Sequence, residues 1–305
     1  MKNVSIGSGI QASEIGLGCM RITGLNKGEA KRLIDEAMDS GINFFDHADI
    51  YAGGEAESFF AEAAGMNPSL REKMIIQSKC AIRPGLCYDF SKEHILASVD
   101  KSLKRLQTDY LDVLLLHRPD ALADPEEVAE AFAQLRRTGK VRYFGVSNHN
   151  PYQIELLNRY CNNEIVVNQL QLSITECGMI DAGINVNMKN EPSINRDGSV
   201  LDYCRLKNIR VQAWSPFQYG FFEGVFLDNE KFPELNQKID EIAGKYGVTN
   251  SAVAVAWILR HPAKIQTIVG TTNVNRLKDI CRAADFSLTR EEWYEIYLAS
   301  GKTLP

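Results

Sequence analysis

Four side chains with complementary chemistry follow three apolar runs of this sequence. Asp46 ends the run 42–46, and Tyr51 comes shortly after it. Lys79 ends the run 74–79, and His117 follows the run 111–116. If these runs are neighbouring parallel strands, their carboxyl ends lie about 5 Å apart and the four side chains can touch. A carboxylate, a phenol, an ammonium and an imidazole in contact would form a proton-donating site that needs neither a metal nor a covalent nucleophile.

The phenol of Tyr51 is the candidate proton donor of this group. A free tyrosine titrates near about 10, and an ammonium within about 4–6 Å lowers that pKa by about 1–3. We therefore expect Lys79 to lower the pKa of Tyr51, and Asp46 to keep Lys79 charged and oriented, since an unpaired buried ammonium is costly. Tyr51 and His117 would together donate to an alkoxide as it forms on a carbonyl, with the reductant supplied by a cofactor.

A metal site is the alternative use of the first segment. His47 and Asp49 stand beside Asp46, and a barrel hydrolase could use these three groups as metal ligands. Barrel metal sites usually gather His and carboxylates from many strands, whereas the other runs here end in Lys, Asn and Gln. We therefore expect no metal.

The seven cysteines are scattered and include no Cys-x-x-Cys pair, which argues against a zinc site or a disulfide framework. Cys19 and Cys80 differ from the rest because each lies near a predicted strand end. Oxidation at these two positions could affect activity.

Composition is that of an ordinary globular protein. The chain has 305 residues, is 45% hydrophobic and carries a net charge of -5, with a pI near 5.7. This charge balance does not indicate a basic surface for nucleic acid. No apolar run approaches the roughly 20 residues that are needed to cross a bilayer. The N-terminus lacks the apolar region of a secretory signal. We expect a single domain over residues 1–305, in the cytoplasm, without nucleic-acid or membrane partners.

The elements that must position the four side chains alternate along the chain. Segments with the apolar spacing of helices lie between these runs. Gly41 is predicted to end the first of these helices, Ser91 to cap the start of another, and Asp124-Pro125 to begin a third. The runs are continuous, as in parallel strands covered on both sides. They occupy residues 14–19, 42–46, 74–79, 111–116, 142–147, 164–170, 209–214 and 265–270.

Eight such units predict an α/β fold, a single (β/α)8 TIM barrel preceded by a short N-terminal β-hairpin. An open doubly wound sheet would carry a Gly-x-Gly-x-x-Gly turn after an early strand. Ala12 and Arg21 stand where the third glycine of the two candidate turns should be. Residues 180–198 are polar and Asn-rich, follow the sixth strand, and could form either a lid or a solvated connector.

Two segments resemble the signatures of the aldo-keto reductase superfamily. Residues 45–57 are similar to Asp-Thr-Ala-x-x-Tyr-Gly-x-x-Glu, with His47 in place of Thr, and residues 139–149 are similar to the second signature. The similarity continues through 167–169, 213–216 and 269–272, and the C-terminal end resembles a bacterial oxidoreductase branch. The resemblance implies reduction of aldehyde or ketone carbonyls to alcohols by hydride transfer. It makes Tyr51 the general acid, with Asp46, Lys79 and His117 completing a tetrad.

The resemblance also implies a dinucleotide site. Ser147, Asn148 and Gln169 would hydrogen-bond the nicotinamide carboxamide, and Trp214 stands where many relatives stack a Tyr on the ring. The first loop and the pyrophosphate-binding stretch would contribute Gly18, Cys19, Met20, Ser215, Phe217 and Gly220.

The adenosine end departs from the family pattern. Relatives with a strong NADPH preference often have Lys-Ser where this chain has Gly270-Thr271. Arg276 remains at the position that grips the 2′-phosphate, and Asp279 aligns with an adenine-contacting acid. Since a single guanidinium can bind phosphate well, NADP(H) is favoured, with NAD(H) as the alternative.

The substrate is expected to be a small carbonyl compound that the sequence does not identify. Arg21, Ile50, Arg83, Tyr88 and Arg118 are candidates to line its pocket, with surface or structural roles as the alternative. We expect a monomer or weak oligomer. The rival function is that of a nucleotide-binding regulatory or scaffold protein on the same fold, against which the intact tetrad argues.

Overall fold

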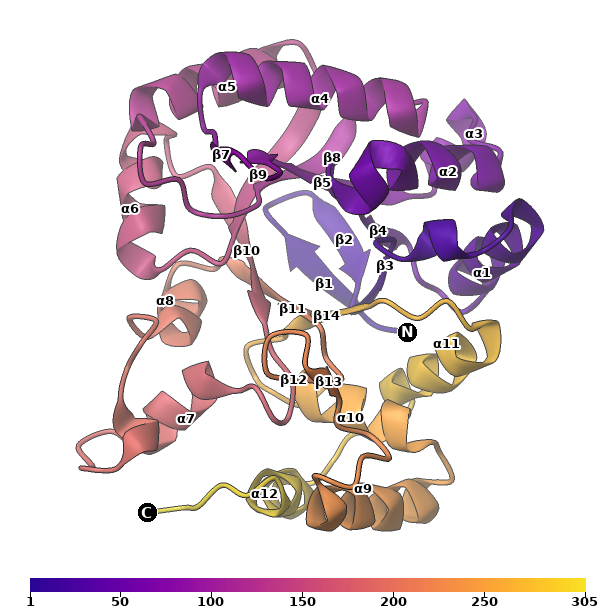
Figure 1. Ribbon diagram of the computed structural model, residues 1–305, viewed down its shortest axis with the longest axis vertical. Helices are drawn as coiled ribbons and strands as arrows, with labels where there is room; N and C mark the ends of the chain where they lie inside the picture. The colour runs from indigo at the N-terminus through magenta and orange to yellow at the C-terminus, as the bar shows by residue number, and fades with distance from the viewer.

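The computed structural model describes residues 1–305 and shows eight parallel strands closed into a barrel. Neighbours around the barrel follow chain order, and the last strand pairs with the first (Figure 1). Each strand overlaps one of the eight ranges predicted from the sequence, so the predicted barrel is confirmed. The strands are β3 (Ile15–Gly18), β4 (Phe44–Asp46), β5 (Ile75–Cys80), β8 (Leu111–Leu116), β9 (Val141–Ser147), β10 (Ile165–Gln171), β11 (Arg210–Trp214) and β14 (Gln266–Val269).

Helices surround the barrel, and their starts follow local capping chemistry (Figure 1). Asp124 accepts a hydrogen bond from the backbone N–H of Glu126 at 2.9 Å, and Ser91 accepts one from His94. The α-helices are α1 (Lys27–Asp39), α2 (Glu55–Ala64), α3 (Pro68–Arg71), α4 (Lys92–Leu106), α5 (Pro125–Arg137), α6 (Pro151–Tyr160), α7 (Gly178–Ile184), α8 (Val200–Leu206), α9 (Pro233–Tyr246), α10 (Asn250–Leu259), α11 (Val274–Cys281) and α12 (Arg290–Ala299). No helix is both long and apolar enough to cross a membrane.

The N-terminal hairpin of β1 (Asn3–Ile6) and β2 (Ile10–Ser13) lies across one end of the barrel (Figure 1). Its apolar side chains, among them Ile6 and Ile10, form a separate core cluster with Phe44, Leu115 and Val167 from the strands. The hairpin therefore closes the end of the barrel opposite the strands' carboxyl ends.

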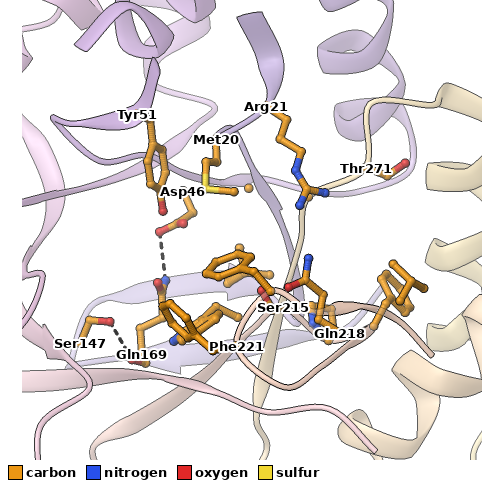
Figure 2. Close-up of a pocket in the computed structure, with 18 of the residues that line it drawn as sticks. Met20, Arg21, Asp46, Tyr51, Ser147, Gln169, Ser215, Gln218, Phe221 and Thr271 are labelled. Atoms are coloured by element: carbon orange, nitrogen blue, oxygen red, sulfur yellow. Dashed lines mark hydrogen bonds between the residues drawn. The ribbon is translucent and has the colours of Figure 1, made fainter. Parts of the chain in front are cut away.

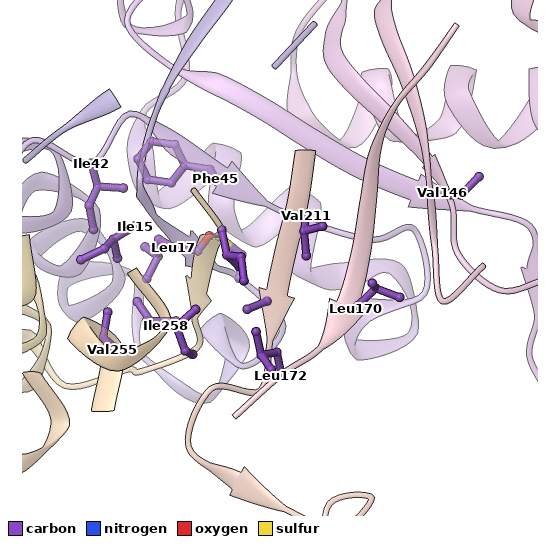
Figure 3. Packing of buried hydrophobic residues seen from close by; sticks show 14 of the residues in the cluster. Ile15, Leu17, Ile42, Phe45, Val146, Leu170, Leu172, Val211, Val255 and Ile258 are labelled. Carbon is purple, nitrogen blue, oxygen red and sulfur yellow. Dashed lines mark hydrogen bonds between the residues drawn. The ribbon is translucent and has the colours of Figure 1, made fainter. Parts of the chain in front are cut away.

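The larger core cluster joins strand residues to the helices. It contains 70 buried residues, including Leu17 of β3 and Val211 of β11 together with Val255 and Ile258 of α10 (Figure 3). Since this cluster takes up the outward-facing strand residues, the inward-facing positions near the carboxyl ends are free to carry polar groups.

Irregular segments after three strands complete the carboxyl end. Short hairpins form from β6 (Ile82–Arg83) with β7 (Cys87–Tyr88) and from β12 (Gln218–Tyr219) with β13 (Gly224–Val225). The polar segment 180–198 contains short regular elements, since α7 continues to Ile184 and a 3-10 turn covers Glu191–Ser193.

Candidate active site

The ends of β4, β5 and β8 bring the predicted tetrad together. The ammonium of Lys79 donates to both carboxylate oxygens of Asp46, at 2.8 and 2.7 Å, and to the carbonyl of His47 at 2.8 Å. It also donates to the hydroxyl of Tyr51, which begins the 3-10 helix η2 (Tyr51–Gly54), at 3.1 Å. Because an ammonium has only three N–H donors, these contacts use all of them and hold the phenol in one position.

The structure corrects the expected acidity of Tyr51. Burial raises the pKa of the phenol, and this effect exceeds the lowering by the Lys79 ammonium. Burial alone would lower the pKa of Lys79, but the carboxylate of Asp46 and the oxygen of Tyr51 raise it above its usual value. The prediction that Lys79 makes Tyr51 more acidic than a free tyrosine is therefore wrong, because it left out desolvation. The site instead holds a neutral phenol against a charged ammonium.

His117 lies beside Tyr51 as a neutral imidazole. The two rings meet edge to face, with centroids 6.1 Å apart. Burial lowers the pKa of His117 to about 2, and the charges of Lys79 and Arg118 add to this effect. A neutral imidazole still has one N–H to donate, so the pair offers two uncharged donors to a carbonyl oxygen.

His47 and Asp49 do not join Asp46 in a ligand cluster. The His47 ring packs 4.6 Å from Phe60 of α2, fully buried, and burial lowers its pKa to about 3. Asp49 faces Glu57 and Arg105, and burial raises its pKa to about 7. The three residues that a metal-dependent hydrolase would need therefore point to different surroundings.

Cys19 and Cys80 are both 1% exposed, and burial raises the pKa of each thiol well above its usual value. This disfavours the reactive thiolate, so the structure argues against oxidation at these positions. Cys87, on β7, is the one exposed cysteine.

A cleft of about 980 Å³ opens in front of the tetrad. Asp46, Tyr51 and His117 line it, while Lys79 lies behind them. The cleft extends from Tyr51 to Thr271 at the far end (Figure 2). The predicted cofactor residues that line it are Gly18, Met20, Ser147, Asn148, Gln169, Trp214, Ser215, Phe217, Gly270, Thr271, Arg276 and Asp279.

Two predicted cofactor residues lie outside the cleft lining. The side chain of Cys19 is buried, with its sulfur 3.7 Å from the carbonyl of Leu17. Both backbone groups of Gly220 form hydrogen bonds within the protein: its N–H donates to Glu176 at 2.8 Å, and its carbonyl accepts from Gln171 at 2.8 Å. Cys19 is therefore a core residue, and Gly220 anchors the β12–β13 turn.

Hydrogen bonds link the residues predicted to bind a carboxamide. The hydroxyl of Ser147 donates to the carbonyl of Gln169 at 2.8 Å (Figure 2). It also accepts from the Asn148 amide at 2.8 Å. The Asn148 oxygen accepts from the Trp214 indole N–H at 3.1 Å. Asn148 has a φ of 59°, the left-handed region, which Asn tolerates better than most residues. These hydrogen bonds hold the Trp214 indole beside the side chains of Asn148 and Ser147.

Sequence reasoning missed several side chains of the cleft. Phe222 stacks on Trp214 with ring centroids 5.8 Å apart, and Phe221 meets the same indole edge to face. Gln218 also lines the cleft, and its buried side-chain oxygen has no protein partner. Phe221 and Phe222 lie on the turn between β12 and β13, and Gln218 lies on the two-residue strand β12, so strand periodicity could not find them.

Four of the five candidate substrate-pocket residues line the cleft: Arg21, Ile50, Tyr88 and Arg118. Arg83 does not, and instead pairs with Asp89 at 3.2 Å. Neither Arg21 nor Arg118 has a carboxylate within ion-pair distance. Arg21 and Arg118 therefore bring two guanidinium groups to the cleft that no carboxylate pairs with directly.

Comparison with known proteins identifies close relatives along the whole chain. The family model described as Aldo/keto reductase family matches residues 14–299. The uncharacterized oxidoreductase YcsN of Bacillus subtilis is 37% identical over 100% of both chains, and a 6-dehydroglucose reductase of Agrobacterium fabrum is 33% identical over 99% of both. The crystal structure of an aldo-keto reductase from Klebsiella pneumoniae in complex with NADPH superposes with a TM-score of 0.78 at 25% identity, covering 97% of this chain and 93% of that one.

Proposed function

This chain belongs to the aldo/keto reductase family of oxidoreductases, and we propose that it reduces aldehyde or ketone carbonyls to alcohols with NADPH. One observation carries the proposal: the hydroxyl of Tyr51 faces an open cleft, 3.1 Å from the Lys79 ammonium and beside the neutral imidazole of His117. Two uncharged donors thus lie side by side in the cleft, and the Lys79 ammonium contacts the one that would give up its proton.

The cleft residues fit a phosphorylated dinucleotide. Arg21 and Arg276 line the cleft without an ion-pair partner, and the buried oxygen of Gln218 lacks a donor. Trp214 offers an indole face beside the amide group of Asn148, suited to a nicotinamide ring. Arg276 supports a preference for NADP(H), because a guanidinium can bind a 2′-phosphate. When bound, the dinucleotide supplies the hydride.

The protein's own groups then manage charge on the carbonyl oxygen. Tyr51 holds its proton across the neutral pH range because burial raises the pKa of the phenol. As negative charge develops on the substrate oxygen, His117 donates a hydrogen bond and Tyr51 transfers its proton. The phenolate that remains lies against Lys79, whose charge Asp46 maintains. Lys79 thus stabilises the phenolate that the transfer leaves, although burial keeps the pKa of Tyr51 above its usual value.

The substitution Tyr51→Phe tests the proposal. We expect NADPH consumption with a panel of aldehydes and ketones to fall by about 10²–10⁴, the usual contribution of a general acid. The dissociation constant of NADPH, measured by quenching of tryptophan fluorescence, should change less than about twofold, because the ring and its packing remain. Titration of the wild type with NADH in parallel measures the dinucleotide preference.

Tyr88→Phe is the matched control, since Tyr88 also lines the cleft but makes no contact with Lys79. Its turnover should stay near that of the wild type. Retained turnover in Tyr51→Phe would remove Tyr51 from the mechanism. Tight NADPH binding by the wild type without consumption on any carbonyl would point instead to a nucleotide-binding regulatory protein.

A further inference from the structure

Four buried glutamines form a hydrogen-bonded chain through the barrel interior. The amide nitrogen of Gln266 donates to the backbone carbonyl of Ser13 at 2.7 Å, and that of Gln212 donates to the oxygen of Gln266 at 2.9 Å and of Gln77 at 3.2 Å. The oxygen of Gln212 accepts from Gln77 at 2.9 Å and from Gln169 at 3.0 Å. All four side chains are at most 2% exposed, so no solvent competes for these contacts.

The chain of amides ends at the carboxylate of the tetrad. One oxygen of Asp46 accepts from the amide nitrogen of Gln169 at 3.0 Å (Figure 2). The same oxygen accepts from the amide nitrogen of Gln77 at 2.7 Å. Both ends of the chain, the Ser13 carbonyl and the Asp46 carboxylate, can only accept. Turning any amide over would therefore place oxygen against oxygen, so the chain has one consistent orientation.

This orientation determines which end of Gln169 is available. Its nitrogen is used twice inside the barrel, on Asp46 and Gln212, whereas its side-chain oxygen accepts no hydrogen bond from the protein. Gln169 lines the cleft. The neighbouring amide of Asn148 differs, because its oxygen already accepts from Trp214 and its nitrogen donates to Ser147. The oxygen of Gln169 is thus the open amide acceptor at this point of the cleft.

We propose that Gln212 and Gln266 are positioning residues, which fix Gln169 with its oxygen toward the cleft and so make the site select a ligand with an N–H at that place. The inference rests on the proposed function, in which this ligand group is the nicotinamide carboxamide. Neither positioning residue lines the cleft. They act only through Gln169, because Gln212 shares the Gln169 nitrogen with Asp46 and Gln266 holds Gln212 in place.

The test compares binding of NADP+ with that of its 3-acetylpyridine analogue, which keeps the ring carbonyl but has a methyl group in place of the amino group. Affinities are measured by calorimetric titration, independently of turnover. We expect the wild type to bind NADP+ about tenfold more tightly, since one hydrogen bond to an otherwise unpaired acceptor is lost with the analogue. In Gln212→Met, which removes the amide at similar length, Asp46 is the one remaining acceptor for the Gln169 nitrogen. The amide of Gln169 is then held less firmly, and the preference should fall to about threefold or less.

Two further variants make the result interpretable. Gln266→Met leaves every contact of Gln169 in place but removes the oxygen that accepts from Gln212 and links it to Ser13. The preference should therefore fall here too, and this variant serves if Gln212→Met does not fold. Asn168→Leu is the control, because Asn168 is a buried amide on the same strand that donates to His149 outside the glutamine chain at 2.9 Å. It should keep the wild-type preference.

The outcomes separate this inference from the proposed function. If the wild type binds neither dinucleotide, the proposed function fails and this inference with it. If the wild type binds both with equal affinity, or if the two methionine variants keep the full preference, the inference is overturned while the proposed function stands. A loss of preference in the methionine variants alone supports the positioning role.

Discussion

A buried tyrosine can give up a proton only if the phenolate that it leaves behind has a partner. Lys79 is that partner here, with Asp46 maintaining its charge. The residue types and their places at strand ends were predictable, because each follows a clear apolar run. The direction of the Tyr51 pKa was not, since it depends on how completely the packed loops remove water from the phenol.

Asp49 shows the same effect of burial at a position that sequence reasoning treated as a metal-ligand candidate. Its pKa is raised to about 7, against about 3.8 in the unfolded chain, by burial and by the nearby Glu57. Between these pH values the folded state binds the extra proton, so stability falls as the pH rises from about 4 to about 7.

We therefore predict that Asp49→Asn increases the free energy of unfolding at pH 8 by about 1–3 kcal/mol and has little effect at pH 4. Urea unfolding across this range measures the difference. Asp240→Asn, at an exposed site, is the control and should leave the pH dependence unchanged. An unaltered slope in Asp49→Asn would show that Asp49 is ionised in the folded protein.

Among the elements, regular ones followed the sequence closely and irregular ones did not. The start of α5 was predicted from Asp124 and Pro125, and the structure places it there. The polar composition of segment 180–198 was compatible with either a lid or a solvated connector, and did not predict that the segment contains the end of α7, which Ile180 anchors in the core. Short helices of this kind depend on tertiary contacts that composition does not reveal.

The cap of α5 can be tested directly. Asp124→Ala removes the acceptor for the backbone N–H of Glu126, and we expect a loss of about 1 kcal/mol in the free energy of unfolding. Asp124→Asn keeps an oxygen at the same place and should cost much less. Denaturant melts of the two variants give the comparison, and an equal loss in both would mean that the charge rather than the hydrogen bond stabilises the helix.

At the scale of the whole molecule, the two ends of the barrel differ in the chemistry of their side chains. The hairpin closes one end with apolar side chains, and the polar groups gather at the other. The eight-unit alternation predicted this architecture. The glutamine chain between the two ends was not predicted, since Gln77, Gln212 and Gln266 stand in separate runs and only barrel closure brings them together.

This division predicts that stability and ligand binding can be changed separately. Ile6→Ala removes fully buried atoms from the hairpin cluster and should cost about 2–4 kcal/mol of stability by chemical denaturation. The dissociation constant of NADPH should stay within about twofold, because the cleft lies at the opposite end. Ser8→Ala, exposed in the hairpin turn, is the control. A large change in NADPH affinity in Ile6→Ala would mean that the two ends are coupled.

The burial of six of the seven cysteines has a practical consequence. Cys87 alone presents its sulfur to solvent, next to Tyr88 on the rim of the cleft. A maleimide fluorophore would therefore attach at one defined place in the unmodified sequence, close enough to the mouth to report when something enters it.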